Sequence, residues 1–471
     1  MRQTIPQNNE LIKNLVGVLA AHRVLYGQAR VYERVVALVL AEGMVLARHT
    51  VTQLLMVLGL NERDWSAWYR LFSQERFDEQ AAGEVMLGET LKHVGADEVY
   101  VVAGDGTQVA RASHKMEGTS WLRHPLTPVF RPGIHRAQRW FNGSWLMPQE
   151  NGYSRALPLR FLPAFVEKAV LKAHQACTEW EAALAFVSWI RERLDKAGRA
   201  QQQVLLLVDG SFDTLPLWKA LPQRVVMLAR SAKNRRLYHL PDEQQRRDGR
   251  RRYGSPAPQP QEFVRRRTGW QVCALTIRGR ERRLRCRVEG PFTRHGAPDV
   301  PLFLLVAGGQ TYSQHGRLRH REPVYYLVNA TFQAGRWILP LSIDTLLFWA
   351  WQRWEIEVAH REMKTSFGLG DKQCWNPRSA VVTVQWSAWV YSLFLLAGYR
   401  TWGLSLAPPV PTRWWRGAGR WSFTTLWRAY RAALWGEHQF LPLSFLSPAN
   451  LLLSPSLRLA LDNAVFGAAR P

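Results

Sequence analysis

Two runs of apolar, β-rich residues stand out along the chain, and each is followed by an aspartate and a glycine. Val99 to Ala103 is continuously apolar, as expected of a strand buried on both faces, and it ends in Gly104-Asp105-Gly106-Thr107. Val204 to Val208 has the same character and ends in Asp209-Gly210-Ser211. Residues 162–196 between them have amphipathic helical spacing, and 224–228 predicts a third short strand. The pattern predicts an α/β unit with two strand-end aspartates.

A helical pattern extends from Asp344 to Gly370. We expect one long helix in which Asp344 caps the start and Phe367-Gly368-Leu369-Gly370 forms the end. At 100° per residue, three of its charged residues fall within about 60° of one another: Arg353, Glu357 and Lys364. Glu355 and Glu362 point the opposite way and are expected on the outer side. An ordinary solvated charged face explains this pattern equally well on its own.

Residues 1–95 show helical spacing only. A capping-box pattern at 50–53 opens a short helix that ends at Gly59, and Asn61 can cap a second helix. The second helix has an apolar stripe of Trp65, Trp68, Tyr69 and Phe72. Two short helices with a Gly-containing turn are typical of a DNA-binding helix-turn-helix, and also of a structural or dimerisation bundle.

The charge balance favours a polyanionic partner. The 471-residue chain carries 62 Lys and Arg against 37 Asp and Glu, a net charge of +25, and its 22 tryptophans indicate a folded protein. Its four cysteines have no zinc spacing and its first residues have no signal-peptide pattern, so we expect reduced thiols and a cytoplasmic location. Ala380 to Tyr399 has no charge and is long enough to cross a bilayer, but its polar residues favour a buried core helix.

A long basic segment separates the second aspartate from the charged helix. Of the 147 residues between Asp209 and Glu357, the part around Arg224 to Arg287 has 19 Lys or Arg against 5 Asp or Glu. A solvated loop is the ordinary explanation of a charge run, but this surplus favours contact with DNA phosphates. The residues selected for this contact are Arg250, Arg251, Arg252, Arg265, Arg266 and Arg267. Strand-like alternation from Trp270 to Asn329 predicts a β-rich insertion.

The segment from Tyr399 to Gly436 contains six Trp and six Arg and no Asp or Glu. Interleaved Arg and Trp side chains can stack on bases or follow a nucleic-acid backbone. They can equally form a packing or dimerisation surface in which Arg stems cover the aromatic rings.

The two strand-end aspartates and the helical glutamate define a candidate metal site. In α/β sheets, ligands bind at the carboxyl ends of the strands, where Asp105 and Asp209 are expected. Three carboxylates held together repel one another unless they bind a cation, and oxygen ligands suit Mg²⁺ or Mn²⁺. Two such ions activate water or a 3′-hydroxyl for phosphodiester displacement. Arg353 and Lys364 beside Glu357 would contact phosphates.

These residues resemble the motif of the DDE transposases of bacterial insertion sequences, which have an RNase H-like catalytic core. Arg353, Glu357 and Lys364 match the spacing of a Y-x2-R-x3-E-x6-K signature, with Ala350 where that signature has tyrosine. The resemblance covers about residues 96–400. It implies metal-assisted cleavage at transposon ends and strand transfer into target DNA. It also implies a homodimer on double-stranded DNA, bound to the nucleoid, and an insertion over the DNA end in which Trp270 or Trp337 stacks on a flipped base.

The expected architecture is an RNase H-like α/β core with a β-rich insertion, flanked by a helical DNA-binding region and a helical C-terminal region. Its expected parts are 1–95 (helical), 96–230 (first part of the core), 231–335 (basic insertion), 336–400 (second part of the core) and 401–471 (Trp/Arg-rich). Two other functions stay open: an RNase H-like nuclease that never joins strands, and a non-catalytic DNA-binding relative. A membrane-associated protein rests on the apolar segment 380–399 alone.

Overall fold

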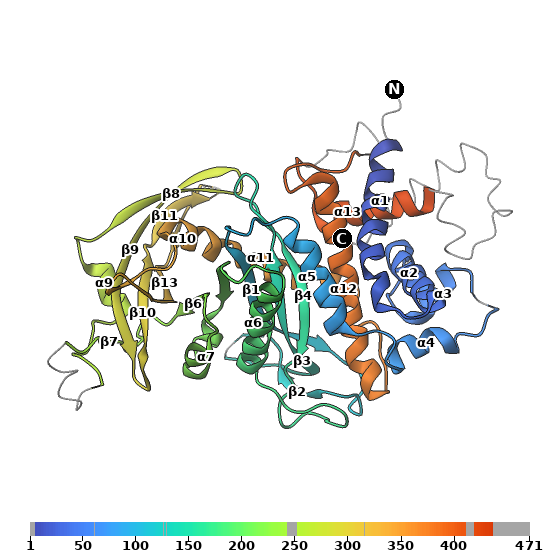
Figure 1. Cartoon of the computed structure of the whole chain (residues 1–471), viewed down its shortest axis with the longest axis horizontal. Coiled ribbons are helices and arrows are strands. Elements are labelled where there is room, and N and C mark those ends of the chain that lie inside the picture. Colours follow the sequence, from blue (N-terminus) through green and yellow to red (C-terminus); the bar gives the residue numbers. More distant parts are fainter. Residues whose placement is uncertain are drawn as a thin grey trace.

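The computed structural model describes residues 5–60, 62–125, 127–128, 130–242, 252–314, 316–410 and 419–436. A large mixed sheet runs through the middle of the molecule, with helices packed beside it and a group of helices at one end (Figure 1). Asn61, Arg250 and Arg251 lie outside the described residues.

Five strands in the order β4-β3-β1-β5-β6 form the centre of the sheet. Strands β1 and β3 are antiparallel, as are β3 and β4, whereas β5 and β6 run parallel to β1. The short strand β2 pairs with β3. The strands are β1 (Tyr100–Ala110), β2 (Thr119–Arg123), β3 (Ile134–Leu146), β4 (Ala156–Pro163), β5 (Val204–Val208) and β6 (Val225–Ser231). This order confirms the expected RNase H-like α/β core.

The predicted insertion continues this sheet. Strand β13 pairs antiparallel with β6, and the order then continues β10-β9-β7, with β8 against β9. Backbone hydrogen bonds therefore run without interruption from the core into the insertion. Its strands are β7 (Tyr238–His239), β8 (Gln271–Ile277), β9 (Arg280–Arg294), β10 (Ala297–Ala307) and β13 (Val324–Asn329), with two small hairpins, β11–β12 (Gln310–Gln314, Arg317–Arg321) and β14–β15 (Thr331–Gln333, Arg336–Ile338).

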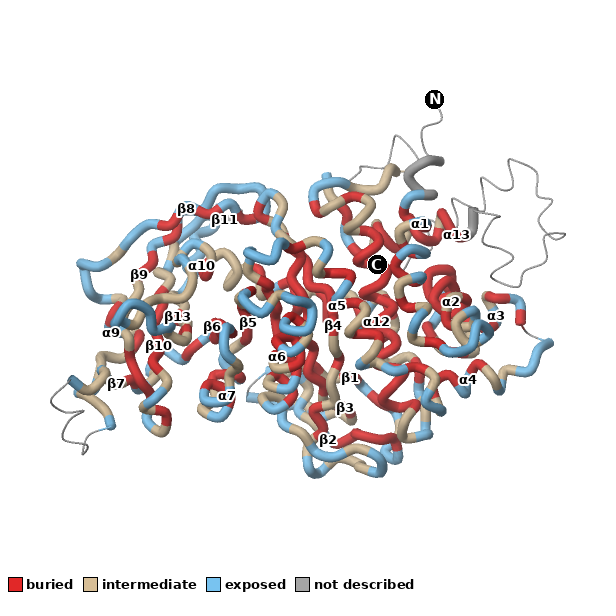
Figure 2. Tube along the Cα trace, in the orientation of Figure 1, coloured by how far each residue is buried: buried red, intermediate tan, exposed pale blue. Residues whose placement is uncertain are grey.

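Helix α12 (Pro377–Trp402) is the central helix of the molecule. It packs against β4 on one side and against the N-terminal helices on the other, and residues 380–398 are all buried (Figures 1 and 2). This helix alone, in the described part of the chain, is long and apolar enough to cross a membrane. Its most apolar stretch is wholly inside the protein, as expected for a core helix.

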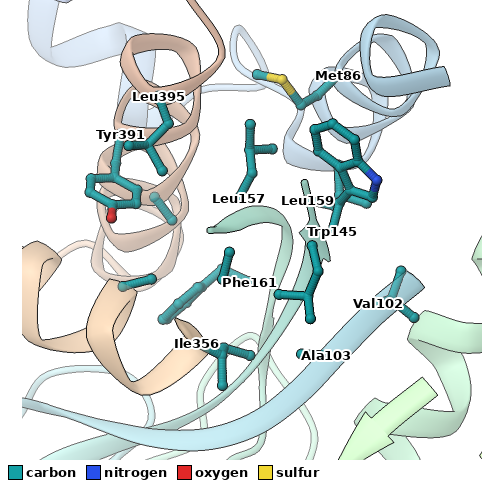
Figure 3. Packing of buried hydrophobic residues seen from close by; sticks show 14 of the residues in the cluster. Met86, Val102, Ala103, Trp145, Leu157, Leu159, Phe161, Ile356, Tyr391 and Leu395 are labelled. Atoms are coloured by element: carbon teal, nitrogen blue, oxygen red, sulfur yellow. The ribbon is translucent and has the colours of Figure 1, made fainter. Parts of the chain in front are cut away.

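The other helices pack around α12 and the sheet. Near the N-terminus they are α1 (Ile5–Ala21), η1 (His22–Leu25), α2 (Ala29–Met44), α3 (Val51–Val57), α4 (Ser66–Ser73) and α5 (Glu79–Leu91). The core and insertion contribute α6 (Glu179–Lys196), η2 (Gly210–Phe212), α7 (Leu215–Ala220), α9 (Pro260–Arg265), α10 (Ile343–Gln352) and α11 (Trp354–Thr365), and α13 (Phe423–Gly436) follows α12. Figure 3 shows side chains of β1, β4, α11 and α12 meeting in one core, among them Val102, Phe161, Ile356 and Tyr391.

The helix pair near residue 50 packs its apolar face inward. Thr50 caps α3 as predicted, because its side chain accepts a hydrogen bond from the Gln53 N–H. Trp68 and Phe72 of the expected apolar stripe are buried, and Phe72 makes an edge-to-face contact with Trp386 of α12. Tyr69 is exposed, so the expected stripe is wrong at this position. Arg63 and Arg70 remain exposed on the outer surface, which is the face left for a partner.

The expected single helix 344–370 is wrong in two respects. Ser342, and not Asp344, caps its start by accepting a hydrogen bond from the Thr345 N–H. The helix is also interrupted at Arg353, which separates α10 from α11. At this point Ile356 N–H bonds to the carbonyl of Arg353, three residues back, so the turn is tighter than an α-helical turn.

Three tryptophans of the C-terminal segment are buried. Trp402, Trp421 and Trp427 are each at most 4% exposed. The guanidinium of Arg155 lies 4.6 Å from the ring of Trp421. Burial of this kind excludes base stacking by these three rings and favours packing. Trp414 and Trp415 lie outside the described residues.

Candidate active site

Strand register brings the two predicted aspartates to the same level of the sheet. In the parallel pair β1–β5, Gly104 lies opposite Val208, so Asp105 and Asp209 are the next residues on neighbouring strands. The prediction that β1 ends before Asp105 is wrong, because β1 continues to Ala110 through its pairing with β3. Asp105 therefore projects from a continuous strand at the point where its parallel partner β5 stops. Asp209 begins η2, where its Oδ1 atom accepts hydrogen bonds from Ser211 N–H (2.8 Å) and Oγ (2.6 Å).

The carboxyl group of Asp105 has a raised pKa. Burial raises the pKa of its carboxyl group, the guanidinium of Arg353 opposes this, and the carboxylates of Asp209 and Glu357 raise it further, to about 7. The mutual influence of these groups shows that the three acids lie in one electrostatic neighbourhood. A carboxyl group in this position gains from a nearby cation.

Arg353 connects the helix to the strand. Its Nη2 atom donates to Oε1 of Glu357 at 2.6 Å, and its Nη1 atom lies 4.0 Å from Oδ2 of Asp105. The Nη1 atom is buried and has no hydrogen-bond partner. The break between α10 and α11 places this guanidinium between Asp105 and Glu357, so it acts as their counter-ion.

His360 fixes helix α11 against the sheet. Burial lowers the pKa of His360 to about 3, with help from Lys364 and Arg353, so the ring is neutral at physiological pH. The Nδ2 group of Asn142 donates to Nε2 of this ring at 3.0 Å. Asn142 is also the strand partner of Asp105. One hydrogen bond thus ties the level of the sheet that carries Asp105 to the helix that carries Glu357.

Glu355 and Glu362 face away from Asp105, but the expectation that they lie on the outer side is wrong. Glu362 accepts hydrogen bonds from Arg155 and from Tyr391 Oη (2.6 Å), both buried. Glu355 accepts from Arg278 at 3.1 Å and is 7% exposed. Both glutamates therefore lie in ion pairs, with Glu355 buried and Glu362 half-buried.

Two residues missed by sequence reasoning lie beside the predicted ones. Glu179, in the first turn of α6, packs so closely on Gly106 that a Cβ there would overlap its Oε1 atom. Burial raises the pKa of Glu179, Arg139 at 3.3 Å opposes this, and Asp209 raises it further. Glu179 is thus a fourth carboxylate at this edge of the sheet. Only tertiary packing reveals it, since a glutamate in the first turn of a helix is common.

Tyr326 of β13 is the second missed residue. Together with Ala350 it lines a cavity of about 530 Å³ whose wall also contains Arg230, Arg321 and Arg353. Burial raises the pKa of the Tyr326 hydroxyl, and the same three arginines oppose this. A phenol from the insertion therefore lies close to the position where the transposase signature has a tyrosine and this chain has alanine.

Lys364 lines a larger cavity of about 920 Å³, next to Gly106 and Glu357. Partial loss of hydration lowers the pKa of its ammonium group, and the Asp105 carboxylate opposes this shift. Lys364 therefore lies within electrostatic reach of Asp105, as its helical spacing from Glu357 predicts.

Asp213, which follows η2, does not cap α7. Thr214 holds the cap position, and the buried Asp213 accepts instead from Arg235 and Arg294, both at 2.5 Å, and from Trp218 Nε1 at 2.8 Å. Arg294 belongs to β9, so this aspartate anchors the insertion to the core. A buried charge is stable only with such partners.

The arginines selected from the basic segment lie apart from this site. Arg252, Arg265, Arg266 and Arg267 are exposed, as phosphate contacts must be. Helix α9, which includes Arg265, is at the outer end of the sheet, well separated from α11 (Figure 1). Trp270 is partly covered by Arg285 and Arg287. Trp337 packs on Phe332 in the hairpin β14–β15.

The residues present suit a divalent cation by their chemistry. Asp105, Asp209 and Glu357 offer only oxygen donors, and Asp105 has too little positive charge around it. In the described part of the chain, however, no three His, Cys, Asp or Glu side chains lie close enough together to hold a metal ion. The guanidinium of Arg353 lies where two of the carboxylates would converge, and Asp209 is turned toward Ser211.

In a comparison with protein families, the family described as DDE superfamily endonuclease matches residues 28–289, more than half of the chain. The matched segment includes both Asp105 and Asp209 and ends before Glu357. The comparison with curated proteins finds no match.

Proposed function

Because the chain belongs to the DDE superfamily endonucleases, we propose that it is a transposase that cleaves DNA at transposon ends and joins them to target DNA. One observation supports this most strongly. The register of β1 and β5 places Asp105 and Asp209 on adjacent strands, and Arg353 joins Asp105 to Glu357.

Asp105, Asp209 and Glu357 would hold the divalent metal, Mg²⁺ or Mn²⁺. When bound, such ions supply activation of the attacking oxygen and charge stabilisation of the leaving oxygen in phosphodiester displacement. The Nη1 atom of Arg353 is buried without a hydrogen-bond partner, 4.0 Å from Asp105, so a phosphate held at this carboxylate would supply its acceptor. Lys364 adds a second cation, and the neutral His360 keeps α11 in position.

The assignment is tested by replacing Asp209 with asparagine. With DNA that carries the inverted repeats flanking the gene, Asp209→Asn is expected to abolish Mg²⁺-dependent cleavage and to leave DNA binding intact. Glu357→Gln should behave alike, whereas Glu355→Gln on the same helix is the matched control and should still cleave. Retained cleavage by Asp209→Asn would remove this residue from the site.

Two measurements distinguish the proposed transposase from the two alternative functions. A nuclease that never joins strands would give cleaved ends and no joined products in a strand-transfer assay. A non-catalytic relative would bind end DNA without nicking it in Mg²⁺ or Mn²⁺. The proposed homodimer on paired ends is tested by the mass of the protein–DNA complex in solution.

The exposed arginines of the insertion are proposed to contact the DNA backbone away from the active site. Arg265, Arg266 and Arg267 form a continuous exposed basic run, which suits phosphates spaced along a duplex. The outer face of α3 and α4 is proposed as a further DNA contact, through Arg63 and Arg70.

A further inference from the structure

A cavity of about 920 Å³ opens beside the candidate active site, and several separate stretches of the chain form its wall. They include residues 106–112 of β1 and its end, His124 and His135 near β2 and β3, residues 357–373 around α11, and Arg48 from the N-terminal region. The cavity therefore reaches from the candidate catalytic carboxylates to the N-terminal helices.

The carboxylates in this wall are all engaged. Glu179 lies 3.3 Å from Arg139, and Glu357 accepts a hydrogen bond from Arg353 at 2.6 Å. Asp371 accepts from the backbone N–H of His49 at 3.0 Å.

Most of its cations are not engaged. Of the four cations in the wall, Arg111 donates hydrogen bonds to backbone carbonyls and to a glutamine side chain. Among the described residues, Arg48, Arg361 and Lys364 have no ion-pair or hydrogen-bond partner for their side chains. Two of the three carboxylates pair with arginines and Asp371 accepts from a backbone N–H, so the four cations leave the cavity with uncompensated positive charge. Such a surplus in a concave wall favours a ligand with several anionic groups.

The planar rings in the wall of the cavity favour an unpaired strand over a duplex. In a duplex the bases are stacked inside and present only their edges in the grooves, so their faces cannot reach such rings. The imidazole rings of His124 and His135 line the same space, with ring centres 4.6 Å apart. Burial, helped by His124 and Lys364, lowers the pKa of His135, so this ring offers a neutral planar surface. Unpaired bases stack on such rings.

We propose that this cavity binds a single, unpaired DNA strand next to the cleaved phosphate, with Arg48, Arg361 and Lys364 on its phosphates. The proposal rests on the proposed DNA-cleaving function and deepens it. It makes the N-terminal region part of the strand-binding surface, because Arg48 belongs to the segment between α2 and α3.

The test compares two fluorescent DNAs that differ only in a short unpaired tail. Binding of the full chain to blunt and tailed duplex is measured by anisotropy over a range of salt concentrations, in EDTA so that no cleavage occurs. In the double variant Arg48→Ala/Arg361→Ala, the preference for tailed over blunt DNA should disappear, because two cations that bind the phosphates of the tail are removed. The slope of log Kd against log salt for the tail should fall by about 0.7 per cation, because single strands release about that many counter-ions per phosphate contact.

Two matched variants complete the experiment. Arg265→Ala/Arg267→Ala removes the same charge far from the cavity and should weaken blunt and tailed DNA equally. Arg48→Lys/Arg361→Lys keeps the charge and should retain the salt slope. An unchanged tail preference in the alanine variant, or an equal loss on both DNAs, overturns the proposal. Because the assay needs no catalysis, its failure is distinct from retained cleavage by Asp209→Asn, which would contradict the proposed function.

Discussion

Around Asp105, single residues determine how much negative charge the sheet edge carries. Four carboxylates from β1, η2, α6 and α11 lie in this neighbourhood, and they share two guanidinium groups: Asp105, Asp209, Glu179 and Glu357 with Arg139 and Arg353. Burial is the main cause of the raised pKa of Asp105, and the nearby acids add to it in spite of Arg353. The excess of acids over cations also explains why this site would attract a divalent cation.

Gly106, which follows Asp105, leaves room for the carboxylate of a neighbouring glutamate, whereas Gly210, which follows Asp209, does not. In Gly106→Ala, the new Cβ overlaps the Glu179 carboxylate. That group ends a flexible side chain, so it is displaced and the fold persists. Moving this negative charge away from the site should raise the Kd for Mn²⁺ roughly tenfold, which corresponds to about 1.4 kcal/mol. Calorimetry measures this change.

Gly210→Ala is the control for this substitution. Its Cβ would meet only the carbonyl oxygen of Arg230 at 3.3 Å, so a small effect is expected. Equal Mn²⁺ affinities for the two variants would contradict a role for Glu179 near the metal.

The sequence predicted an element correctly where the same hydrophobic pattern continued along the whole element. Strand β5 was expected at 204–208 and has those bounds, because a run buried on both faces is apolar throughout. The predicted strand β1 was too short, because the sequence of its second half looks like an Asp-Gly turn. In the structure this half pairs only with β3. The interruption at Arg353 could not be foreseen from the helical period. Arg353 keeps helical dihedral angles (φ −49°, ψ −33°), and neither glycine nor proline marks the position.

Opposite faces of α11 serve different purposes. Glu357 faces the candidate active site. Glu362 pairs instead with the buried Arg155, which directly precedes β4, and with Tyr391 of α12. Sequence periodicity separated these faces correctly. It could not show that the second face is covered, because the covering residues lie about 200 positions earlier in the chain and in the following helix.

Glu362→Gln is therefore expected to destabilise the protein although Glu362 does not face the candidate active site. The substitution leaves the Arg155 guanidinium buried without its carboxylate, which costs about 3–5 kcal/mol. Tyr391→Phe removes one hydrogen bond to the same carboxylate and should cost less, about 1.5–3 kcal/mol. Urea unfolding measures both. A Glu362→Gln protein as stable as the wild type would show that this pair does not anchor α11.

At the scale of the whole molecule, the N-terminal helices and the core behave as one packed unit. Helix α12 touches both, and a buried ionic network crosses between them. Glu42 of α2 accepts from Lys372 Nζ at 2.7 Å, from His49 Nδ1 at 2.6 Å and from Trp386 Nε1 at 3.1 Å. This continuity is what allows Arg48 to line a cavity next to α11.

Stability should depend on pH through this network. Burial alone would raise the pKa of Glu42, but Lys372 and His49 hold it below its usual value. A carboxyl group whose pKa is lower in the folded than in the unfolded state stabilises the fold fully above about pH 4.3, and this contribution is lost as pH falls through the folded-state pKa. Glu42→Gln should cost about 3–5 kcal/mol at pH 7, because it leaves Lys372 buried and unpaired.

Denaturant unfolding of the wild type and the variant at successive pH values measures this difference, which should shrink only below about pH 4.3. Glu10→Gln breaks an exposed ion pair with Lys13 and should change stability by less than about 1 kcal/mol at every pH. A difference between wild type and Glu42→Gln that stays constant down to pH 3, or that vanishes at pH 7, would contradict a buried ionised Glu42. The N-terminal helices would then be joined to the core by apolar packing and by their other ion pairs, such as Arg400 with Glu89.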